Sequence, residues 1–499
     1  MASFHLRNFG CRASQADGAA LRRQLLDAGL QEAVSADASD VAVLNTCTVT
    51  ATADAEVRQL IRRIHRTNPT CKIVVTGCYA QRAPTEIAGL EGVAWVVGNS
   101  HKHALVEILG SGISYSATPS LPPRDSEFGV RGSQKSYPSE RVPDAGNDSP
   151  RLVVLSTHTE TRTPNPVSNG SPVQVLVGEI SDEFHFAPAF PDDRTRPTLK
   201  VQDGCNARCS FCIIPEVRGP SRSLAPAQVV EQVRALHDRG FKEIVLSGIN
   251  LGSYGRDLGR RVTFLGLLER ILAGTSIARL RISSIEPMDV SRDLIRLAAS
   301  EPRLADHFHV PLQSGCDRIL RAMNRRYWTR QYAERIHAIR DQLPHAAIGA
   351  DVMVGFPGET AADHDTSLRF IDSLPLTYVH VFPYSRRPGT PAAGRLGQVE
   401  GSVARERGRA IRAAVNEKRQ AFLATQIGRS LAALTLDDEA DGAPVALSSN
   451  YLKVALPGAD VRPNTLLGVG IGRLAGDMLY GYAEPPEPSA FSHQPSAVS

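Results

Sequence analysis

The first hundred residues alternate between two patterns of apolar positions. Short apolar runs predict strands, at residues 4–8, 41–45, 73–76 and 94–97. Amphipathic spacing predicts helices between them, at 17–28 and 53–66. Strands that alternate with helices are typical of βαβ units and a parallel sheet. The pattern therefore predicts an α/β domain over residues 1–110.

The same alternation returns over residues 196–427. Strands are predicted at 243–246, 279–282, 307–310, 349–354 and 378–381, and helices at 226–238, 290–299 and 329–342. A β/α repeat of this length without a Rossmann glycine signature favours a barrel or partial barrel. Its last part, 395–427, is a basic helical region.

Three stretches break the alternation. Residues 111–195 are rich in proline and serine, which predicts an insertion or linker, with candidate strands only at 151–155 and 173–177. Short alternating strands over 428–484, such as 451–455 and 466–471, predict a small β-barrel. The Pro/Ser-rich tail at 485–499 is expected to be disordered.

Composition narrows the function classes. The chain has 499 residues, a net charge of +4 and eight cysteines. Nucleic-acid binding must therefore come from local basic clusters, for which 58–66 and 405–419 are candidates, although charged runs are usually solvated helix faces. Since the chain lacks a long apolar run and a signal pattern, we expect a cytoplasmic protein without membrane contact. Cysteines in that compartment are more often metal ligands or catalytic thiols than disulfides.

Three cysteines stand close together in the second α/β region. Cys205, Cys209 and Cys212 form a CxxxCxxC motif, which rarely occurs by chance. Each thiolate can hold one iron of a cubane cluster, which leaves a fourth iron free to bind the amino and carboxylate groups of a small molecule such as S-adenosylmethionine (SAM). A structural cluster or a zinc loop is the alternative, although structural zinc usually takes four protein ligands. Gly204 before the motif permits a tight backbone approach.

Three other cysteines are dispersed, and each follows a predicted strand. Because the carboxyl ends of parallel strands meet at one edge of a sheet, Cys11, Cys47 and Cys78 could gather around a second cluster. The alternative is that they are apolar core residues. Cys71 is interpreted as a surface or half-buried residue and Cys316 as a packing residue.

Several sequence runs carry a family resemblance. They are NTCTVT at 45–50, VTGCYAQ at 75–81, QDGC at 202–205, RISSIEP at 281–287, PLQSG at 311–315, DVMVGFPGET at 351–360 and PYS at 383–385. On these runs the chain resembles the radical SAM methylthiotransferases over about 4–105 and 196–425. Among them it looks most like the branch that acts on threonylcarbamoyladenosine in tRNA.

The resemblance implies a fold and a set of cofactors. The fold would be α/β, with a flavodoxin-like N-terminal domain, a partial (β/α) barrel and a C-terminal β-barrel of the TRAM type. Cys205, Cys209 and Cys212 would hold a [4Fe-4S] cluster that cleaves SAM. Cys11, Cys47 and Cys78 would hold an auxiliary [4Fe-4S] cluster that delivers sulfur. No catalytic residue is assigned beyond these ligands.

The resemblance also places SAM near a turn, where Gly248 and Asn250 could bond its amino group and Glu286 its ribose or amine. A plain strand-end turn and a solvated acid are the alternatives for these residues. His307 and His309 are interpreted as core or rim histidines.

The implied reaction is methylthiolation at C2 of N6-threonylcarbamoyladenosine in the tRNA anticodon stem-loop, with a flavodoxin or ferredoxin as electron donor. One alternative is the same chemistry on isopentenyladenosine or on a ribosomal protein. The other is an iron–sulfur protein that binds RNA or senses redox state without catalysis.

Overall fold

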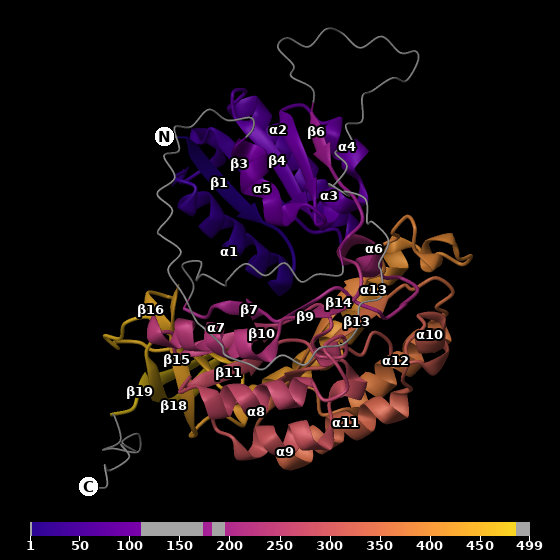
Figure 1. Cartoon of the computed structure of the whole chain (residues 1–499). Coiled ribbons are helices and arrows are strands. Elements are labelled where there is room, and N and C mark those ends of the chain that lie inside the picture. The colour runs from indigo at the N-terminus through magenta and orange to yellow at the C-terminus, as the bar shows by residue number, and fades with distance from the viewer. Residues whose placement is uncertain (1, 111–172, 182–194, 486–499) are drawn as a thin grey trace, which may run out of the picture.

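The computed structural model describes residues 2–110, 173–181 and 195–485, which form three packed units (Figure 1). An N-terminal parallel sheet lies over a set of parallel strands wrapped by helices, and a small closed barrel lies beside those strands. This arrangement confirms the predicted α/β fold class with a C-terminal β-barrel.

The N-terminal unit is a parallel sheet with helices on its faces. Its strands, in spatial order, are β2 (Gln31–Glu32), β1 (Ser3–Asn8), β3 (Val41–Thr46), β4 (Lys72–Gly77), β5 (Val93–Gly98) and β6 (Gln174–Leu176). Its helices are α1 (Arg12–Asp27), α2 (Ala51–Thr67), α3 (Cys78–Arg82), α4 (Pro84–Ala88) and α5 (Leu105–Gly110). The first five strands follow the flavodoxin-like order, in which ligands bind beyond the carboxyl ends of the strands.

Helix α1 begins earlier than the sequence predicts. It starts at Arg12, directly after the extended residue Cys11, and not near Asp17. Small and polar residues such as Ala13, Ser14 and Asp17 are buried along its first turns, where the helix packs on β7 of the next unit. Because no large apolar side chains mark this contact, the apolar pattern underestimates the length of the helix.

Part of the proline-rich segment belongs to the N-terminal sheet. Strand β6 lies within the predicted strand at 173–177 and pairs in parallel with β5 at the sheet edge. The other candidate strand, at 151–155, lies outside the described residues.

The central unit is a partial barrel of parallel strands. In order these are β7 (Thr198–Lys200), β10 (Glu243–Ser247), β11 (Arg279–Ile282), β12 (His307–His309), β13 (Ala347–Val354) and β14 (Tyr378–Pro383). Single bridges from Leu280 to Leu304 and from Ser284 to His309 join its two three-stranded halves. A short antiparallel pair, β8 (Gln202–Asp203) and β9 (Arg222–Ser223), follows β7.

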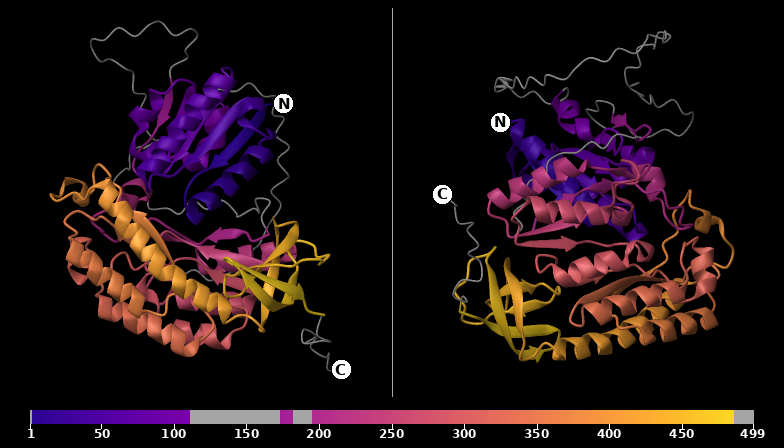
Figure 2. Two further views of the ribbon diagram at one scale, coloured as in Figure 1. Left: turned by 180° about the vertical axis from the view of Figure 1, so that it is seen from behind. Right: turned by 60° about the horizontal axis from the view of Figure 1, so that its bottom comes forward.

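Helices cover the outside of the barrel strands. They are α7 (Pro226–Asp238), α8 (Phe264–Gly274), α9 (Arg292–Ser300), α10 (Asp317–Ala322), α11 (Thr329–Gln342) and α12 (Ala361–Ser373), with the short α6 (Ile214–Arg218) near the N-terminal unit. One apolar core joins the helices from α7 to α12 to the strands. The long helix α13 (Gly401–Ala424) packs along β14 and runs to the C-terminal barrel (Figure 2).

The C-terminal unit is a closed five-stranded barrel. Its strands, in spatial order, are β15 (Ser430–Ala440), β16 (Ala443–Ser448), β17 (Lys453–Ala455), β19 (Met478–Ala483) and β18 (Leu466–Ala475). In the described part of the chain, no helix is both long enough and apolar enough to cross a membrane.

A buried charge network ties this barrel to the central strands. Glu243 is fully buried, and its carboxylate accepts hydrogen bonds from Arg281 at 2.8 Å and Arg279 at 3.3 Å. Arg281 in turn donates to the carbonyls of Ser449 at 2.9 Å and Ser448 at 3.1 Å. Because each charge has partners, the network fixes the β16–β17 turn against the partial barrel.

Candidate functional site

The sheet register brings the dispersed cysteines together. Cys47 follows β3 and Cys78 follows β4, and the last paired residues of these two strands are Thr46 and Gly77. The two cysteines therefore stand side by side at the carboxyl edge of the sheet. Gly10 adopts φ +94°, and a Cβ there would lie 2.3 Å from the Cys47 Cβ, so glycine lets the Cys11 loop reach the same edge.

The sulfur atom of Cys78 accepts hydrogen bonds from two side chains. Arg218 Nε donates to it at 3.3 Å and Asn99 Nδ2 at 3.5 Å. Burial, followed by smaller effects of the neighbouring Cys78 and Cys11, raises the pKa of the Cys47 thiol to about 11. Deprotonation of the Cys47 thiol is therefore expected to accompany metal binding.

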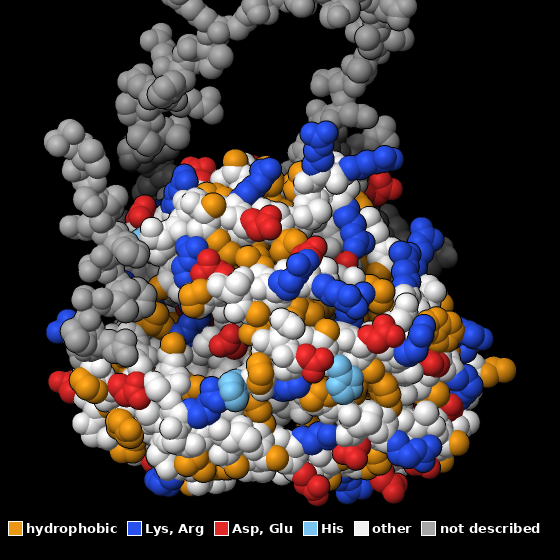
Figure 3. All heavy atoms as spheres, turned by 90° about the horizontal axis from the view of Figure 1, so that it is seen from below, with side chains coloured by type: hydrophobic (Ala, Val, Ile, Leu, Met, Phe, Trp, Pro, Cys, Tyr) orange, Lys and Arg blue, Asp and Glu red, His pale blue; other side chains and the backbone are white. Residues whose placement is uncertain are grey.

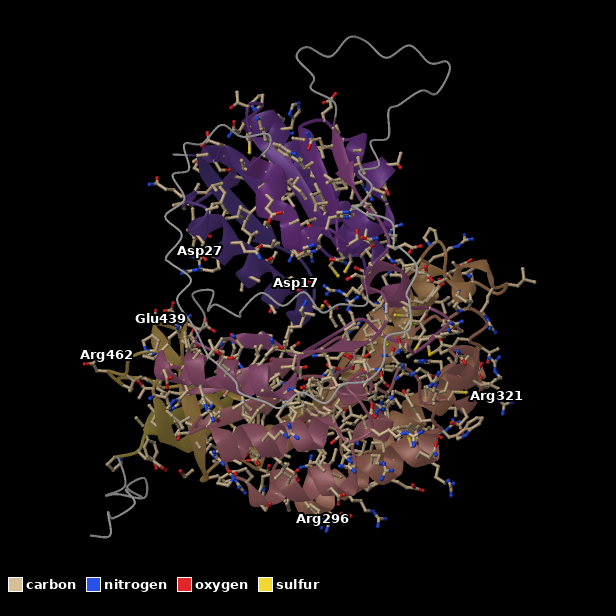
Figure 4. All side chains as sticks on the ribbon, in the orientation of Figure 1. Asp17, Asp27, Arg296, Arg321, Glu439 and Arg462 are labelled. Carbon is tan, nitrogen blue, oxygen red and sulfur yellow. The ribbon has the colours of Figure 1, made fainter. Side chains whose placement is uncertain are left out.

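Arg218 also links the N-terminal unit to the partial barrel. It is 2% exposed, and its guanidinium pairs with Asp17 of α1 at 3.0 Å and with Asp203 of β8 at 3.0 Å. Lys200 bridges the same two carboxylates, and Lys102 pairs with Asp17 at 3.1 Å. Figure 4 shows Asp17 on the side of α1 that faces the partial barrel. This network spans the domain interface next to Cys78.

The adjacent cysteines lie on the loop between β8 and α6. Gly204 has φ +69°, and a Cβ there would lie 1.8 Å from the Pro220 carbonyl oxygen, so the loop requires glycine before Cys205. The Cys212 amide donates to the Cys209 carbonyl at 3.1 Å. Burial raises the pKa of the Cys212 thiol to about 12.

Polar side chains of the partial barrel approach the loop that carries Cys205, Cys209 and Cys212. Arg325 Nη1 donates to Cys209 Sγ at 3.2 Å, and its Nη2 pairs with Glu286. The side-chain amide of Asn250 lies 3.7 Å from Cys205 Sγ. Its Oδ1 atom is buried and has no hydrogen-bond partner among the described residues, so it could accept from the amino group of a small molecule.

The sulfur ligands that both cysteine sets offer fit iron–sulfur clusters. In the described residues, no three His, Cys, Asp or Glu side chains meet closely enough to hold a single metal ion. In a cubane each thiolate binds a different iron, so three cysteines can surround the cluster without meeting at one point. The free Asn250 acceptor beside Cys205 also suits the SAM amino group.

A cavity of about 290 Å³ opens where the three units meet. Its lining comprises Cys11, Arg12, Ala13, Ser247, Gly248, Ser283, Ser284, His307, His309, Asp351, Tyr378, His380 and Tyr451. The loop of the dispersed cysteines thus faces the turn that carries Gly248, across a space large enough for part of a nucleotide. The strand ends supply polar side chains that can orient such a ligand.

For two of the lining residues, His307 and His309, the sequence predicts only a place in the core or at the rim. His307 and His309 are buried, but both also line this cavity and approach the Tyr378 hydroxyl, at 2.7 and 3.1 Å. His309 also pairs with Asp351 at 3.0 Å. The sequence does contain a sign of this polar wall. His307 and His309 are two positions apart, as are Tyr378 and His380, and residues two positions apart lie on the same face of a strand.

Other functional neighbours left no local signal. Arg218 and Arg325 reach sulfur atoms far away in sequence, and Tyr451 enters the cavity from another domain.

The interpretation of Cys71 as a surface or half-buried residue is wrong. It is 3% exposed, because it immediately precedes β4 and packs in the core of the N-terminal sheet.

The basic helix α13 uses many of its cations within the chain. Arg407, Arg412, Lys418 and Arg419 contact Glu359, the Val381 carbonyl, Asp372 and Asp477, respectively. On the face shown in Figure 3, basic side chains are interspersed with acidic and apolar ones. The run at 405–419 is therefore in large part structural, and any RNA contact there falls to the remaining cations.

Comparison with known proteins identifies two family models along the chain. The model of the radical SAM superfamily matches residues 199–371, which include Cys205, Cys209 and Cys212. The model described as uncharacterized protein family UPF0004 matches residues 3–98, which include Cys11, Cys47 and Cys78.

Full-length relatives are also found. A threonylcarbamoyladenosine tRNA methylthiotransferase of Aquifex aeolicus is 34% identical over 90% of this chain and 95% of its own length. The protein of the same name from Bacillus subtilis is 34% identical over 92% and 91%. A tRNA-2-methylthio-N(6)-dimethylallyladenosine synthase of Pelotomaculum thermopropionicum is 30% identical over 97% and 99%.

Proposed function

The chain belongs to the tRNA methylthiotransferases of the radical SAM superfamily, and we propose that it converts N6-threonylcarbamoyladenosine in tRNA to its 2-methylthio derivative. Its cofactors are SAM and [4Fe-4S] clusters. In the proposal, Cys205, Cys209 and Cys212 hold the cluster that binds SAM, and Cys11, Cys47 and Cys78 hold the second cluster.

The observation that carries the proposal is the position of the cavity. Cys11 of the dispersed set lines one side, and Gly248, two residues before Asn250, lines the other. Asn250 in turn lies beside Cys205. A base bound in the cavity would thus be near both cysteine sets, as a reaction that needs a radical and a sulfur source requires.

The chain's own residues bind and orient the reactants. When bound, the cofactors supply reductive SAM cleavage and the sulfur that is transferred. Asn250 Oδ1 would accept from the amino group of SAM, and Glu286 is held by Arg325, which also donates to Cys209. His307, His309 and Tyr378 form a hydrogen-bonded wall for the target base, which must leave the anticodon-loop stack to enter.

Nucleoside mass spectrometry of tRNA tests the function. Deletion of the gene is expected to abolish 2-methylthio-N6-threonylcarbamoyladenosine and to leave its precursor in place, and the wild-type gene restores the product. A Cys209→Ala gene is expected not to restore it. Unchanged levels of the product in the deletion strain would exclude the proposal.

The same digest distinguishes the alternative substrates. Loss of 2-methylthio-isopentenyladenosine, with the threonylcarbamoyl product unchanged, would assign the chain to the activity of the dimethylallyladenosine relative. Purified protein that holds clusters but forms no 5′-deoxyadenosine from SAM would instead indicate an RNA-binding or redox-sensing role.

We also propose the partners and the location of the enzyme. A tRNA substrate agrees with the names of the relatives, and we assign its contacts to the anticodon stem-loop. A flavodoxin or ferredoxin would supply electrons, and the enzyme would work in the cytoplasm. Reduction of the purified protein by either donor, followed by SAM cleavage, tests the electron route.

A further inference from the structure

Arg12 brings an unused hydrogen-bond donor to the cavity between the three units. Its Nη2 atom donates to the Tyr451 hydroxyl at 3.2 Å, and its guanidinium carbon lies 5.9 Å from the centre of that ring. Its Nη1 atom is shielded from solvent and has no hydrogen-bond partner among the described residues. A buried cationic N–H without an acceptor is unfavourable, so a bound acceptor would complete this arrangement.

The protein itself offers Arg12 no carboxylate in the part that the structure describes. Asp351 is the acidic residue that lines the cavity, and it pairs with His309 at 3.0 Å. An adjoining cavity of about 460 Å³, which Arg12 also lines, has Asp437 and Asp438 in its wall. Neither of these forms an ion pair with Arg12 in the described structure. The acceptor for Nη1 must therefore come from outside these residues.

Tyr451 of the C-terminal barrel holds the Arg12 side chain in place. Tyr451 lies in the turn between β16 and β17 with φ +64°, and its ring stacks on His307 with the ring centres 4.4 Å apart. Arg281 fixes this turn through the carbonyls of Ser448 and Ser449. His307 is 2% exposed, and its Nδ1 atom also has no hydrogen-bond partner in the described chain. Arg12 and His307 thus both contact Tyr451 and line this cavity, and each has a buried polar atom without a hydrogen-bond partner in the described chain.

We propose that Arg12 binds a carboxylate on the substituent of the target base, and that His307 Nδ1 bonds another polar atom of the same substituent. The proposal rests on the proposed function, because the threonylcarbamoyl group ends in a free carboxylate and the isopentenyl group is apolar. The planar guanidinium matches a carboxylate in shape and charge. Arg12 is then a specificity-determining residue, and Tyr451 is a positioning residue that acts through it.

An RNA phosphate is the other anion that Arg12 could bind, but its position favours the base. Arg12 follows Cys11 directly, and both residues line the same cavity. An anion on Arg12 is therefore held next to the loop of the dispersed cysteines. A phosphate contact would bind every RNA alike, whereas a contact to the substituent distinguishes among modified bases.

Binding of four anticodon stem-loops to the purified full-length protein tests the proposal. The loops differ only at the target base, which is threonylcarbamoyladenosine, its methyl ester, isopentenyladenosine or adenosine. The wild type is expected to bind the free acid roughly tenfold more tightly than the ester, since the charge-assisted bond is lost in the ester. Arg12→Gln is expected to abolish this preference and to leave the affinity for the adenosine loop unchanged.

Three further variants sharpen the test. Arg12→Lys keeps the charge but not the planar fork, and should retain part of the preference. Tyr451→Phe removes only the hydroxyl that accepts from Arg12, and should reduce the preference by less than Arg12→Gln does. Arg296→Gln is the matched control, because Arg296 is exposed on α9, on the far side of the barrel (Figure 4), and it should leave all four affinities unchanged.

Each remaining outcome also decides the question. Equal weakening of all four loops by Arg12→Gln would identify a phosphate contact and overturn the proposal. Wild-type protein that binds acid and ester equally would overturn it even if the variants fail to fold. If the preference depends on Arg12 but the active enzyme makes no 2-methylthio-N6-threonylcarbamoyladenosine, the proposed function fails and the binding inference stands.

Discussion

Cys205, Cys209 and Cys212 come from one loop between β8 and α6, whereas Cys11, Cys47 and Cys78 come from three separate strand ends. The first set needs only a tight turn to bring its sulfur atoms together. The second set exists only after β1, β3 and β4 have paired in register. A local motif and a site assembled by the sheet topology can thus present the same number of thiols.

The two sets also differ in the charge that supports them. Arg325 beside Cys209 pairs with Glu286, which belongs to the same partial barrel. Arg218 beside Cys78 pairs with Asp17 and Asp203, which lie on opposite sides of a domain interface. The dispersed set is therefore coupled to domain packing, and the loop set is supported within one domain.

Removal of one cysteine from each set should have the largest effect. Cys209→Ala and Cys47→Ala are each expected to lower the iron content from about eight to about four atoms per chain. Cys209→Ala should also abolish SAM cleavage, whereas Cys47→Ala should retain cleavage and lose the methylthio product. Iron and sulfide analysis of anaerobically reconstituted protein, with chromatography of 5′-deoxyadenosine, measures both effects.

Cys71→Ala is the matched control for this pair. Cys71 is as buried as Cys47 and Cys78 but packs in the apolar core of the sheet, so the variant should keep its full iron content. A full complement of iron in Cys47→Ala would contradict the assignment of the dispersed set.

Replacement of the two arginines should have the next largest effect. Arg218→Met removes one of the two cations that bridge Asp17 and Asp203 across the domain interface, the other being Lys200, and we expect a loss of about 3 kcal/mol in stability. Arg325→Met leaves Glu286, whose side chain is 31% exposed and can be hydrated, so a loss of about 1 kcal/mol is expected. Thermal unfolding followed by circular dichroism gives the order of the two midpoints.

Iron analysis of the same two variants tests the coupling. Arg218→Met should lose iron from the dispersed set first and keep SAM cleavage. If Arg325→Met has the lower midpoint, or if Arg218→Met keeps all its iron, the dispersed set does not depend on the domain interface in this way.

The sequence predicts the loop set of cysteines and its partial barrel better than it predicts the dispersed set and its domain contacts, and the reason is physical. Local pattern is sufficient for helix α7 at 226–238, for strand β11 at 279–282 and for the CxxxCxxC loop, because short-range spacing determines each of them. Helix α1 is underestimated, because small side chains and not large apolar ones make its close contact with β7. The contacts of Arg218 with Cys78 and of Tyr451 with Arg12 join residues far apart in the chain, so no local pattern marks them.

The smallest effect is expected from two asparagines, one beside each set. Asn99 Nδ2 lies 3.5 Å from Cys78 Sγ, and Asn250 Nδ2 lies 3.7 Å from Cys205 Sγ. A hydrogen bond to a ligating sulfur stabilises the more negative, reduced cluster. Removal of a bond worth about 1 kcal/mol should lower the one-electron potential by roughly 40 mV. Asn99→Ala should therefore lower the potential of the auxiliary cluster, and Asn250→Ala that of the SAM-binding cluster, in redox titrations followed by electron paramagnetic resonance.

A second measurement separates the two asparagines by their other contacts. Asn250 Oδ1 has no partner among the described residues and faces the proposed site of the SAM amino group, whereas Asn99 also donates to the Val217 carbonyl at 2.7 Å. Asn250→Ala should thus weaken SAM binding about fivefold in calorimetry, and Asn99→Ala should leave it unchanged. Equal SAM affinity in both variants would remove Asn250 from the SAM site. The two cysteine sets would then differ only in how the fold assembles them, because neither asparagine would contribute more than a hydrogen bond to sulfur.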